Sequence, residues 1–487
     1  MGNISSFSTL QLNIRMLAYG ASIESSSVVT SSPPPSVKVT CLPEEPIPHE
    51  VCAIALESVE DAAILERDAI VSLEMGKCAE AKEQLEKVLK FKESYYGCVG
   101  SHLASTINSL AEAHFGLGDF LTARRLCVKA LETEPDDFTS ADVICNLGLA
   151  YIAVGRFEEA KVELEEACDR LNRKSALSDC GLLIKAKVLS VLGITYSYTD
   201  DVEKAKKVVS NCSALIRSYQ VSPQTETKVL DIKCCLGYGL VRTESDDQEK
   251  GLEFLESVVV YFESTHSSDH YKYLDALNLL GFSYGLRLGW ERGLDILERS
   301  AQLAKLHYGD DNIVTCNFFQ SLGIAFSALN DNRKAVEFFE KSLKILEQFR
   351  HPFYEMARLH SFQFLSQCYV KLQNYEKAKE VLKTSLEIEQ KQKSSGRKPT
   401  KSTLTLLAKV YLLIRYQRHD IEFLENNLEK EKRLRHRIEF IDDLVISYIL
   451  LGRAYGAFGD KARETEMNKE ALDMEKRRRE GLLGNGN

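Results

Sequence analysis

One short pattern of apolar, small and aromatic residues recurs along this chain of 487 residues. Its clearest copy is NLGLAYIAVGRFEEA, from Asn146 to Ala160. In a helix, Leu147 and Tyr151 of this copy lie on one face, and Gly155 has the position of a left-handed residue that ends a helix. Gly148 lies inside the helix, where glycine costs about 1 kcal/mol relative to alanine. We therefore expect a second helix to approach the backbone closely at Gly148.

The pattern has a small residue directly after its leucine, an aromatic residue often four positions on, and an alanine at thirteen. Copies follow one another at intervals of 37 to 45 residues, and their leucines are Leu110, Leu147, Leu192, Leu236, Leu280, Leu322, Leu365, Leu407 and Leu451. An earlier copy lacks the leucine but has Gly76 and Ala81 at the matching offsets. One antiparallel helix pair cannot bury such an apolar face alone, so the copies must stack. The sequence predicts an all-α, right-handed α-solenoid of about ten antiparallel helix pairs.

The pattern resembles the tetratricopeptide repeat, whose signature combines L-G-x2-Y with a later aromatic residue and A-x3-F. The resemblance covers roughly residues 60 to 476. The long interval between copies and the phrase from His307 to Asn312 are similar to the kinesin-light-chain and nephrocystin style of the repeat. This resemblance implies a superhelix whose concave groove is lined by the first helix of each pair and binds other proteins.

The chain divides into five parts. Composition predicts a disordered segment at 1–50, which is rich in serine, threonine and proline. Repeats occupy 60–390, and a basic loop with a glycine and a proline interrupts them at 391–403. Degenerate repeats at 404–476 are expected to cap the array with a polar outer face, and 477–487 is expected to be a frayed tail.

The N-terminal segment carries two competing address signals. The opening MGNISS fits N-myristoylation at Gly2, although a single acyl chain gives only marginal, peripheral membrane contact. Alternatively, its many hydroxyl residues and the single acid before Leu42, Glu24, favour a transit peptide. A transit peptide implies a plastid or a mitochondrion, whereas an acylated or unmodified end implies the cytoplasm.

Charge and cysteine usage limit the class of protein. The net charge of −9 and the pI of about 5.7 argue against nucleic acid as the main partner, since phosphate binding needs a basic face. No run of 18 apolar residues indicates a membrane-spanning helix. The 13 cysteines lack metal-ligand spacing, and we expect an intracellular, reducing compartment.

The sequence contains no set of residues that predicts an enzyme, a cofactor or a metal. The stretch from Gly281 to Gly285 matches the G-x-S-x-G motif of hydrolases, but that motif requires a strand before the turn, and this stretch lies in a repeat helix. His266 and His270 have no third ligand nearby in sequence. The vicinal pair Cys234 and Cys235 fits two ordinary helix positions.

The resemblance to kinesin light chains implies that asparagines just before the leucine project into the groove and clamp the backbone of an extended peptide. The matching positions are Asn108 and Asn278, with Asn146 displaced by one residue and Gln363 as a conservative match. Ser190 and Cys234 depart from that pattern. We expect a non-enzymatic adaptor that binds a peptide or partner helix in this groove. The alternative is an assembly or regulatory factor whose N-terminal address directs it to an organelle or a membrane.

Overall fold

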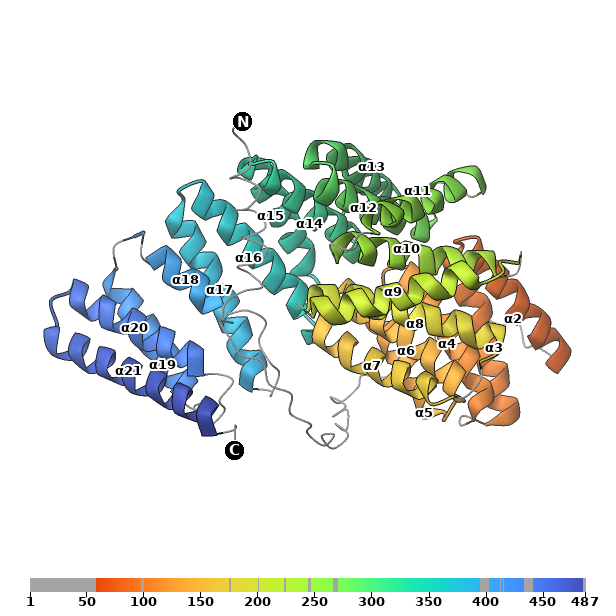
Figure 1. Cartoon of the computed structure of the whole chain (residues 1–487), viewed down its shortest axis with the longest axis horizontal. Coiled ribbons are helices and arrows are strands. Elements are labelled where there is room, and N and C mark those ends of the chain that lie inside the picture. Colours follow the sequence, from red (N-terminus) through yellow and green to blue (C-terminus); the bar gives the residue numbers. More distant parts are fainter. Residues whose placement is uncertain are drawn as a thin grey trace.

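The computed structural model describes residues 58–484, apart from 98–99, 175–176, 200, 223–224, 244–246, 266–269, 395–402, 412, 415 and 433–440. Within this part of the chain every regular element is a helix, and consecutive helices form an array that curves around itself (Figure 1). The all-α solenoid predicted from the repeats is confirmed. Gly2, the rest of the N-terminal segment and His266 lie outside the described residues.

The described helices follow one another as ten successive pairs. The first five pairs are α2 (Val59–Glu74) and α3 (Cys78–Tyr96), α4 (Ser101–Gly116) and α5 (Phe120–Glu132), α6 (Asp137–Ala153) and α7 (Phe157–Asn172), α8 (Asp179–Tyr198) and α9 (Val202–Ser218), α10 (Glu226–Arg242) and α11 (Gln248–Thr265). The others are α12 (Tyr271–Arg287) and α13 (Trp290–Tyr308), α14 (Ile313–Ala328) and α15 (Asn332–Leu346), α16 (Glu355–Lys371) and α17 (Tyr375–Ser394), α18 (Thr403–Tyr411) and α19 (Arg418–Lys432), α20 (Ile441–Ala457) and α21 (Lys461–Gly484). A 3₁₀ turn, η1 (Pro352–Tyr354), precedes α16.

Two helices extend further than the sequence analysis expects. Helix α17 continues to Ser394, so the first residues of the expected 391–403 loop are helical. Lysine and glutamine favour a helix there, and the helix-breaking Gly396 comes later. Helix α21 continues to Gly484 through the stretch expected as a frayed tail, because its arginines and glutamates are good helix formers.

Glycines inside the first helix of a pair allow the second helix to pack closely, as the sequence predicts. A Cβ added to Gly148 would lie 3.1 Å from the Leu164 side chain on α7. A Cβ at Gly323 would lie 2.8 Å from the ring of Phe339 on α15. Gly155 ends its helix with a φ of +76°, in the left-handed region expected for it.

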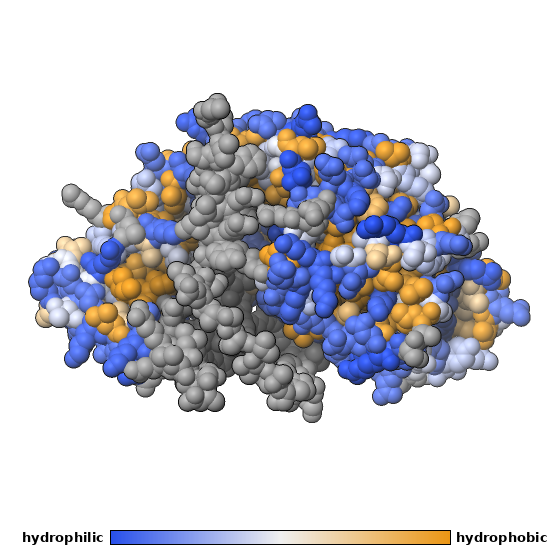
Figure 2. All heavy atoms as spheres, viewed as in Figure 1, coloured by the Kyte–Doolittle hydropathy of each residue, from blue (hydrophilic) through white to orange (hydrophobic). Residues whose placement is uncertain are grey.

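A large apolar core extends from Ala69 in α2 to Met474 in α21, and a smaller separate cluster lies between α8, α9 and α10. Hydrophilic residues form most of the outer surface in Figure 2, with smaller apolar patches between them. Among the described helices, α8 is long and apolar enough to cross a membrane by length and composition, and 67% of its apolar window is buried inside the protein. That degree of burial is typical of a core helix in a stacked array.

Successive turns of the superhelix contact each other along a line that we call the seam. The last carbonyl groups of a helix have no partner within it and are free to accept hydrogen bonds. Side chains from the following superhelical turn bond to three such groups: His270 Nε2 to the Glu74 carbonyl (3.2 Å), Tyr308 Oη to the Gly116 carbonyl (2.8 Å) and Asn317 Nδ2 to the Ala153 carbonyl (3.1 Å). These partners are 164 to 196 residues apart in sequence.

Arg156 makes the strongest seam contact. Its buried guanidinium donates hydrogen bonds to the carbonyl oxygens of Phe353 (3.0 Å) and Pro352 (2.6 Å) in η1. The guanidinium also lies 5.4 Å from the centre of the Phe353 ring and pairs with Glu159 at 2.9 Å. Beside it, a Cβ on Gly155 would lie 2.6 Å from the ring of His360, so the two turns meet here without room for a side chain.

Candidate functional site

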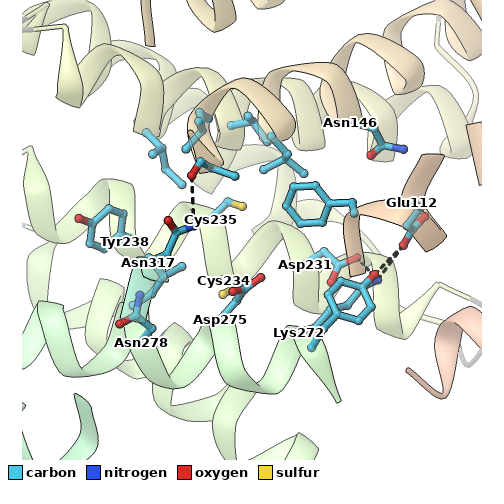
Figure 3. A pocket seen from close by; sticks show the side chains of 18 of the residues that line it. Glu112, Asn146, Asp231, Cys234, Cys235, Tyr238, Lys272, Asp275, Asn278 and Asn317 are labelled. Carbon is cyan, nitrogen blue, oxygen red and sulfur yellow. Dashed lines mark hydrogen bonds and ion pairs between the residues drawn. The ribbon is translucent and has the colours of Figure 1, made fainter. Parts of the chain in front are cut away.

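The seam closes one turn of the superhelix around a cavity of about 290 Å³ (Figure 3). Six helices, α4, α6, α8, α10, α12 and α14, supply most of its wall, together with residues of their partner helices. Much of the wall is apolar, including Val191, Ile194, Val258, Phe262 and Phe318. Polar and charged side chains project into the same space, so the cavity combines an apolar wall with a few polar groups, as small-molecule sites do.

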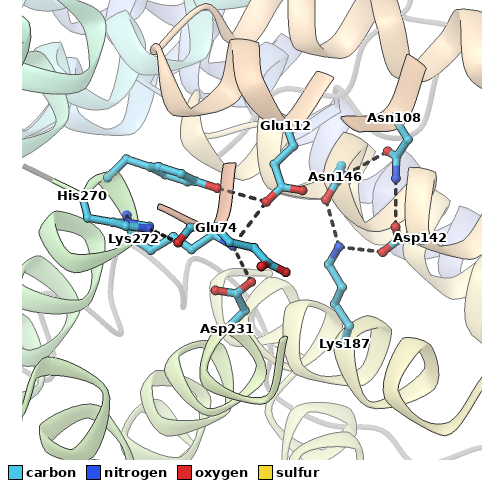
Figure 4. A network of polar contacts seen from close by, with 10 residues as sticks. Glu74, Asn108, Glu112, Asp142, Asn146, Lys187, Asp231, His270 and Lys272 are labelled. Atoms are coloured by element: carbon cyan, nitrogen blue, oxygen red, sulfur yellow. Dashed lines mark hydrogen bonds and ion pairs between the residues drawn. The ribbon is translucent and has the colours of Figure 1, made fainter. Parts of the chain in front are cut away.

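The first charged group of the cavity wall is centred on Lys272 (Figure 4). Its Nζ lies 2.8 Å from Asp231 Oδ2 on α10 and 3.2 Å from Glu112 Oε1 on α4. The Tyr271 hydroxyl donates a further hydrogen bond of 3.1 Å to the same Glu112 oxygen. Lys272 therefore links α12 to α10 in the preceding helix pair and, across the seam, to α4.

Burial and charge act in opposite directions on these carboxyl groups. Burial would raise the pKa of Glu112, but Lys272, Lys187 and the hydrogen bonds outweigh it and lower the value to about 2. For Asp231 burial is the larger effect, so its pKa is raised although the same lysine contacts it. Lys272 itself stays protonated, because its two carboxylate neighbours overcome the effect of burial and raise its pKa.

A second polar group connects α4, α6 and α8. Lys187 Nζ lies 2.7 Å from Asp142 Oδ1 and 3.0 Å from Asn146 Oδ1. Asn146 Nδ2 donates to Asn108 Oδ1 at 2.9 Å, and Asn108 Nδ2 donates to Asp142 Oδ2 at 2.9 Å. The four side chains form a closed ring of hydrogen bonds (Figure 4). The amides of Asn108 and Asn146 are thus engaged with each other and with charged neighbours.

The four residues predicted to clamp a peptide do not share one surface. Asn146 and Asn278 line the cavity, whereas Asn108 is buried behind Asn146. Gln363 lies partly buried on α16 and is not among the residues that line this cavity. Of the four, only Asn278 has a side-chain oxygen that is buried without a hydrogen-bond partner among the described residues.

Alanine at Asn108 and alanine at Asn278 are expected to have different effects on stability. Asn108→Ala removes the hydrogen-bond partner of a partly buried carboxylate oxygen of Asp142 and of the Asn146 amide nitrogen, at a cost of about 1–3 kcal/mol in the free energy of unfolding. Asn278→Ala removes an oxygen that already lacks a partner, so we expect a change below about 0.5 kcal/mol. Thermal unfolding of both variants compares them directly. Equal losses of stability would contradict the hydrogen-bonded ring.

Other chemical candidates from the sequence have structural roles in the described residues. Ser283 lies buried in the middle of α12, without the strand and turn that a nucleophile elbow needs. His270 caps α12 by accepting a hydrogen bond from the Lys272 N–H, and no group of ligands for a metal ion is found among the described residues. Burial raises the pKa of the thiols of Cys234 and Cys235, the latter to about 12, so both stay protonated near neutral pH.

Sequence profiles of the tetratricopeptide repeat match the chain at residues 103–133, 141–170 and 359–392. These segments coincide with α4–α5, α6–α7 and α16–α17, three of the helix pairs described above. The chain is a tetratricopeptide repeat protein. Repeats of this family mediate interactions between proteins. Their presence supports a protein-interaction scaffold.

Solved structures similar to this tetratricopeptide repeat protein share little sequence with it. A Rap protein complexed with Competence and Sporulation Factor has a TM-score of 0.44 and 12% identity, over 76% of this chain and 99% of that one. TPR-like repeats of the kinesin-light-chain type from Podosopora anserina have a TM-score of 0.35 and 18% identity, over 45% and 100%. BtubC from P. vanneervenii has a TM-score of 0.35 and 16% identity, over 50% and 94%. No curated protein sequence matches the chain.

The sequence analysis missed a series of polar residues on the inner face of the superhelix, which recur at the same position of successive repeats. Each lies five residues before the leucine of its copy, and the series is Asp142, Lys187, Asp231, Asp275 and Asn317. Four of the five line the cavity, and Asp142 is bonded to Lys187. Charged residues recurring at a fixed offset were therefore a signal for the inner face that could have been read from the sequence.

Proposed function

We propose that this tetratricopeptide repeat protein is a non-enzymatic scaffold that binds a segment of a partner protein at the inner face of its superhelix, for the assembly or regulation of a protein complex. The observation that carries the proposal is the composition of the cavity. Its wall is largely apolar, and it includes a hydrogen-bond acceptor, Asn278 Oδ1, that has no partner among the described residues. Protein interiors are close-packed, so a hollow of this size needs a reason.

The seam restricts what the inner face can accept. Because the turn is closed between α2–α6 and α12–α14, the inner face there is a cavity and not a groove open along its length. A volume of about 290 Å³ has room for one or two side chains of a partner, not for a whole helix. We accordingly expect the partner to insert a short stretch of its chain and to make its other contacts elsewhere on the array.

Photo-crosslinking from the cavity tests this proposal. A diazirine-bearing amino acid replaces Asn278 in the cavity, and the matched control carries it at Val162, which is 60% exposed on the outer helix α7. We expect a discrete adduct from position 278 whose linked peptide is one short segment, and we expect the synthetic form of that segment to compete with it. Adducts that form equally from both positions, or from position 162 alone, would contradict binding at the inner face.

The second proposal concerns the N-terminal address, which lies outside the described residues. In this alternative the chain is an organelle- or membrane-targeted assembly factor, supported by the MGNISS opening with Gly2 and by the scarcity of acids before Leu42. Mass spectrometry of the native N-terminus separates the possibilities. A myristoylated Gly2 would indicate peripheral attachment to a membrane, and a mature chain that starts near Leu42 would indicate import into an organelle. An unmodified N-terminus would contradict both.

A further inference from the structure

Two acceptors on α12 face the cavity without a partner. Asp275 and Asn278 are three residues apart, which places their side chains on the same face of the helix, and both line the cavity (Figure 3). No described residue forms an ion pair or a hydrogen bond with the Asp275 carboxylate. Asn278 Oδ1 is buried and likewise lacks a donor among the described residues. A buried acceptor without a donor is costly, which makes Asn278 a candidate for contact with a ligand. The Asp275 carboxylate is exposed to the cavity on the same face of α12 and has no cation bound to it, so it can take part in the same site.

The cations of the cavity wall are already engaged elsewhere. Lys272 contacts Asp231 at 2.8 Å and Glu112 at 3.2 Å, and Lys187 contacts Asp142 at 2.7 Å. When all are ionised, the four carboxylates Glu112, Asp142, Asp231 and Asp275 therefore exceed the two lysines by two negative charges. The uncompensated charge is nearest to Asp275, which has no lysine of its own. A ligand that complements this site carries positive charge.

The surroundings of Asp275 favour an organic cation over a metal ion. No cluster of three or more metal-ligating side chains is found in the described part of the chain. The cavity wall near α12 is formed by apolar groups such as Val258, Phe262, Leu279 and Phe318. Such a wall cannot hydrate a small metal ion, but it accommodates a hydrocarbon stem. The volume of about 290 Å³ suits a group of the size of one long side chain.

We propose that the cavity binds a primary ammonium or guanidinium group on an aliphatic stem, with the Asp275 carboxylate as counterion and Asn278 Oδ1 as a hydrogen-bond acceptor. The stem lies against the apolar wall, and the charged end lies between the two acceptors on α12. Such a group can come from a free small amine or from a lysine or arginine side chain of a partner protein. The proposal does not depend on the scaffold function, because a free amine satisfies the same contacts.

Titration of Asp275 gives the site a defined pH dependence. The Asp275 side chain is exposed to the cavity, but protein surrounds the cavity. Desolvation by this surrounding protein, and then the charge of Asp231, raises the pKa of Asp275 to about 7. The titratable groups that interact with it are Asp231, Cys234 and Cys235 on α10 and Tyr308 on α13. Burial keeps Cys234 and Tyr308 protonated near neutral pH, so Asp275 is the group that titrates. A cation binds its ionised form, and affinity is expected to rise between pH 6 and pH 8.

Calorimetry and ligand-observed NMR with the full chain test the proposal. The free probe is pentylamine with pentan-1-ol as its neutral counterpart, and the side-chain probe is N-acetyl-lysine methylamide with the norleucine analogue. We expect saturable binding of the charged member of a pair, at least tenfold tighter than its neutral counterpart. Binding of pentylamine alone identifies a free amine as the ligand class, and binding of the lysine derivative identifies a partner side chain. Absence of binding by both charged probes overturns the proposal.

The variants are Asp275→Asn at the site and Asp295→Asn on the exposed face of α13 as the matched control. Asp275→Asn should weaken the charged probe at least tenfold at pH 8 and abolish its pH dependence, whereas Asp295→Asn should leave both unchanged. Folding of Asp275→Asn is checked by its melting temperature. Since desolvation disfavours the carboxylate, this variant should melt higher than the parent at pH 8, and the difference should shrink as the pH falls below 7 and vanish only below the ordinary pKa of an aspartate, 3.8. Unchanged amine affinity in a folded Asp275→Asn variant would refute the assignment.

Discussion

Arg156→Ala is expected to open the superhelical turn. The substitution removes two hydrogen bonds from a buried guanidinium to the carbonyl oxygens of Pro352 and Phe353, and also the contact of that guanidinium with the Phe353 ring. Hydrogen bonds from charged donors each contribute about 1.5–3 kcal/mol. We expect a loss of about 3 kcal/mol of stability, a lower melting temperature, and a larger radius of gyration in small-angle X-ray scattering.

Arg173→Ala is the matched control for this experiment. Arg173 caps α7 on the outside of the array, where its side chain is exposed and makes no contact across the seam. The control should keep the scattering curve and the melting temperature of the parent, because exposed side chains contribute little to stability. If Arg156→Ala remains folded and its scattering curve superimposes on that of the parent, Arg156 does not hold the turn closed.

Lys272→Met should destabilise the protein more than any other single change in the cavity wall. It leaves the carboxylates of Glu112 and Asp231 without their cation in a partly buried site, and removal of one partner from such a group costs about 3–5 kcal/mol. Because the pKa of Glu112 is lowered to about 2, its contribution is complete above its unfolded pKa near 4.5 and is lost as the pH falls towards 2. The difference in melting temperature between parent and variant should therefore be large at pH 7 and shrink below pH 4.5.

Two further variants make the Lys272 result specific. Lys305→Met removes an exposed lysine whose ion pair with Asp310 is also exposed, and such pairs contribute about 0–1 kcal/mol. Adding Glu112→Gln and Asp231→Asn to Lys272→Met removes the unpaired charges and should restore part of the lost stability. A triple variant that is no more stable than Lys272→Met would show that the loss arises from packing instead of charge.

The features that the sequence predicts well are local and repeated. Gly148 and Gly155 lie at fixed offsets of the repeated pattern, although not every copy has glycine there, and their roles follow from helix geometry within one pair. The all-α solenoid follows in the same way, because stacking satisfies each pair by contact with its neighbours. The ends of α17 and α21 are less predictable, since helix propensity carries both helices past the boundaries that the repeat pattern suggests.

The seam and the cavity could not be predicted from local patterns. They depend on how far each pair rotates relative to the previous one, and small rotations add up over the 192 to 197 residues that separate Tyr308 from Gly116 and Phe353 from Arg156. The assignment of Asn108 to a peptide clamp stays a prediction. It did not consider Asp142 in the next repeat, which binds the Asn108 amide first.

The seam also fixes the number of repeats within the closed turn. In an ordinary solenoid each repeat contacts its neighbours alone, so a unit can be inserted or deleted with little effect on the others. Here the carbonyls at the ends of α2, α4 and α6 meet donors from α12, the end of α13 and α14. Removing one helix pair between them would shift every donor past its acceptor. A single repeat can therefore be neither inserted into the closed turn nor deleted from it without loss of the seam, and the repeats of this turn should unfold together as one cooperative block.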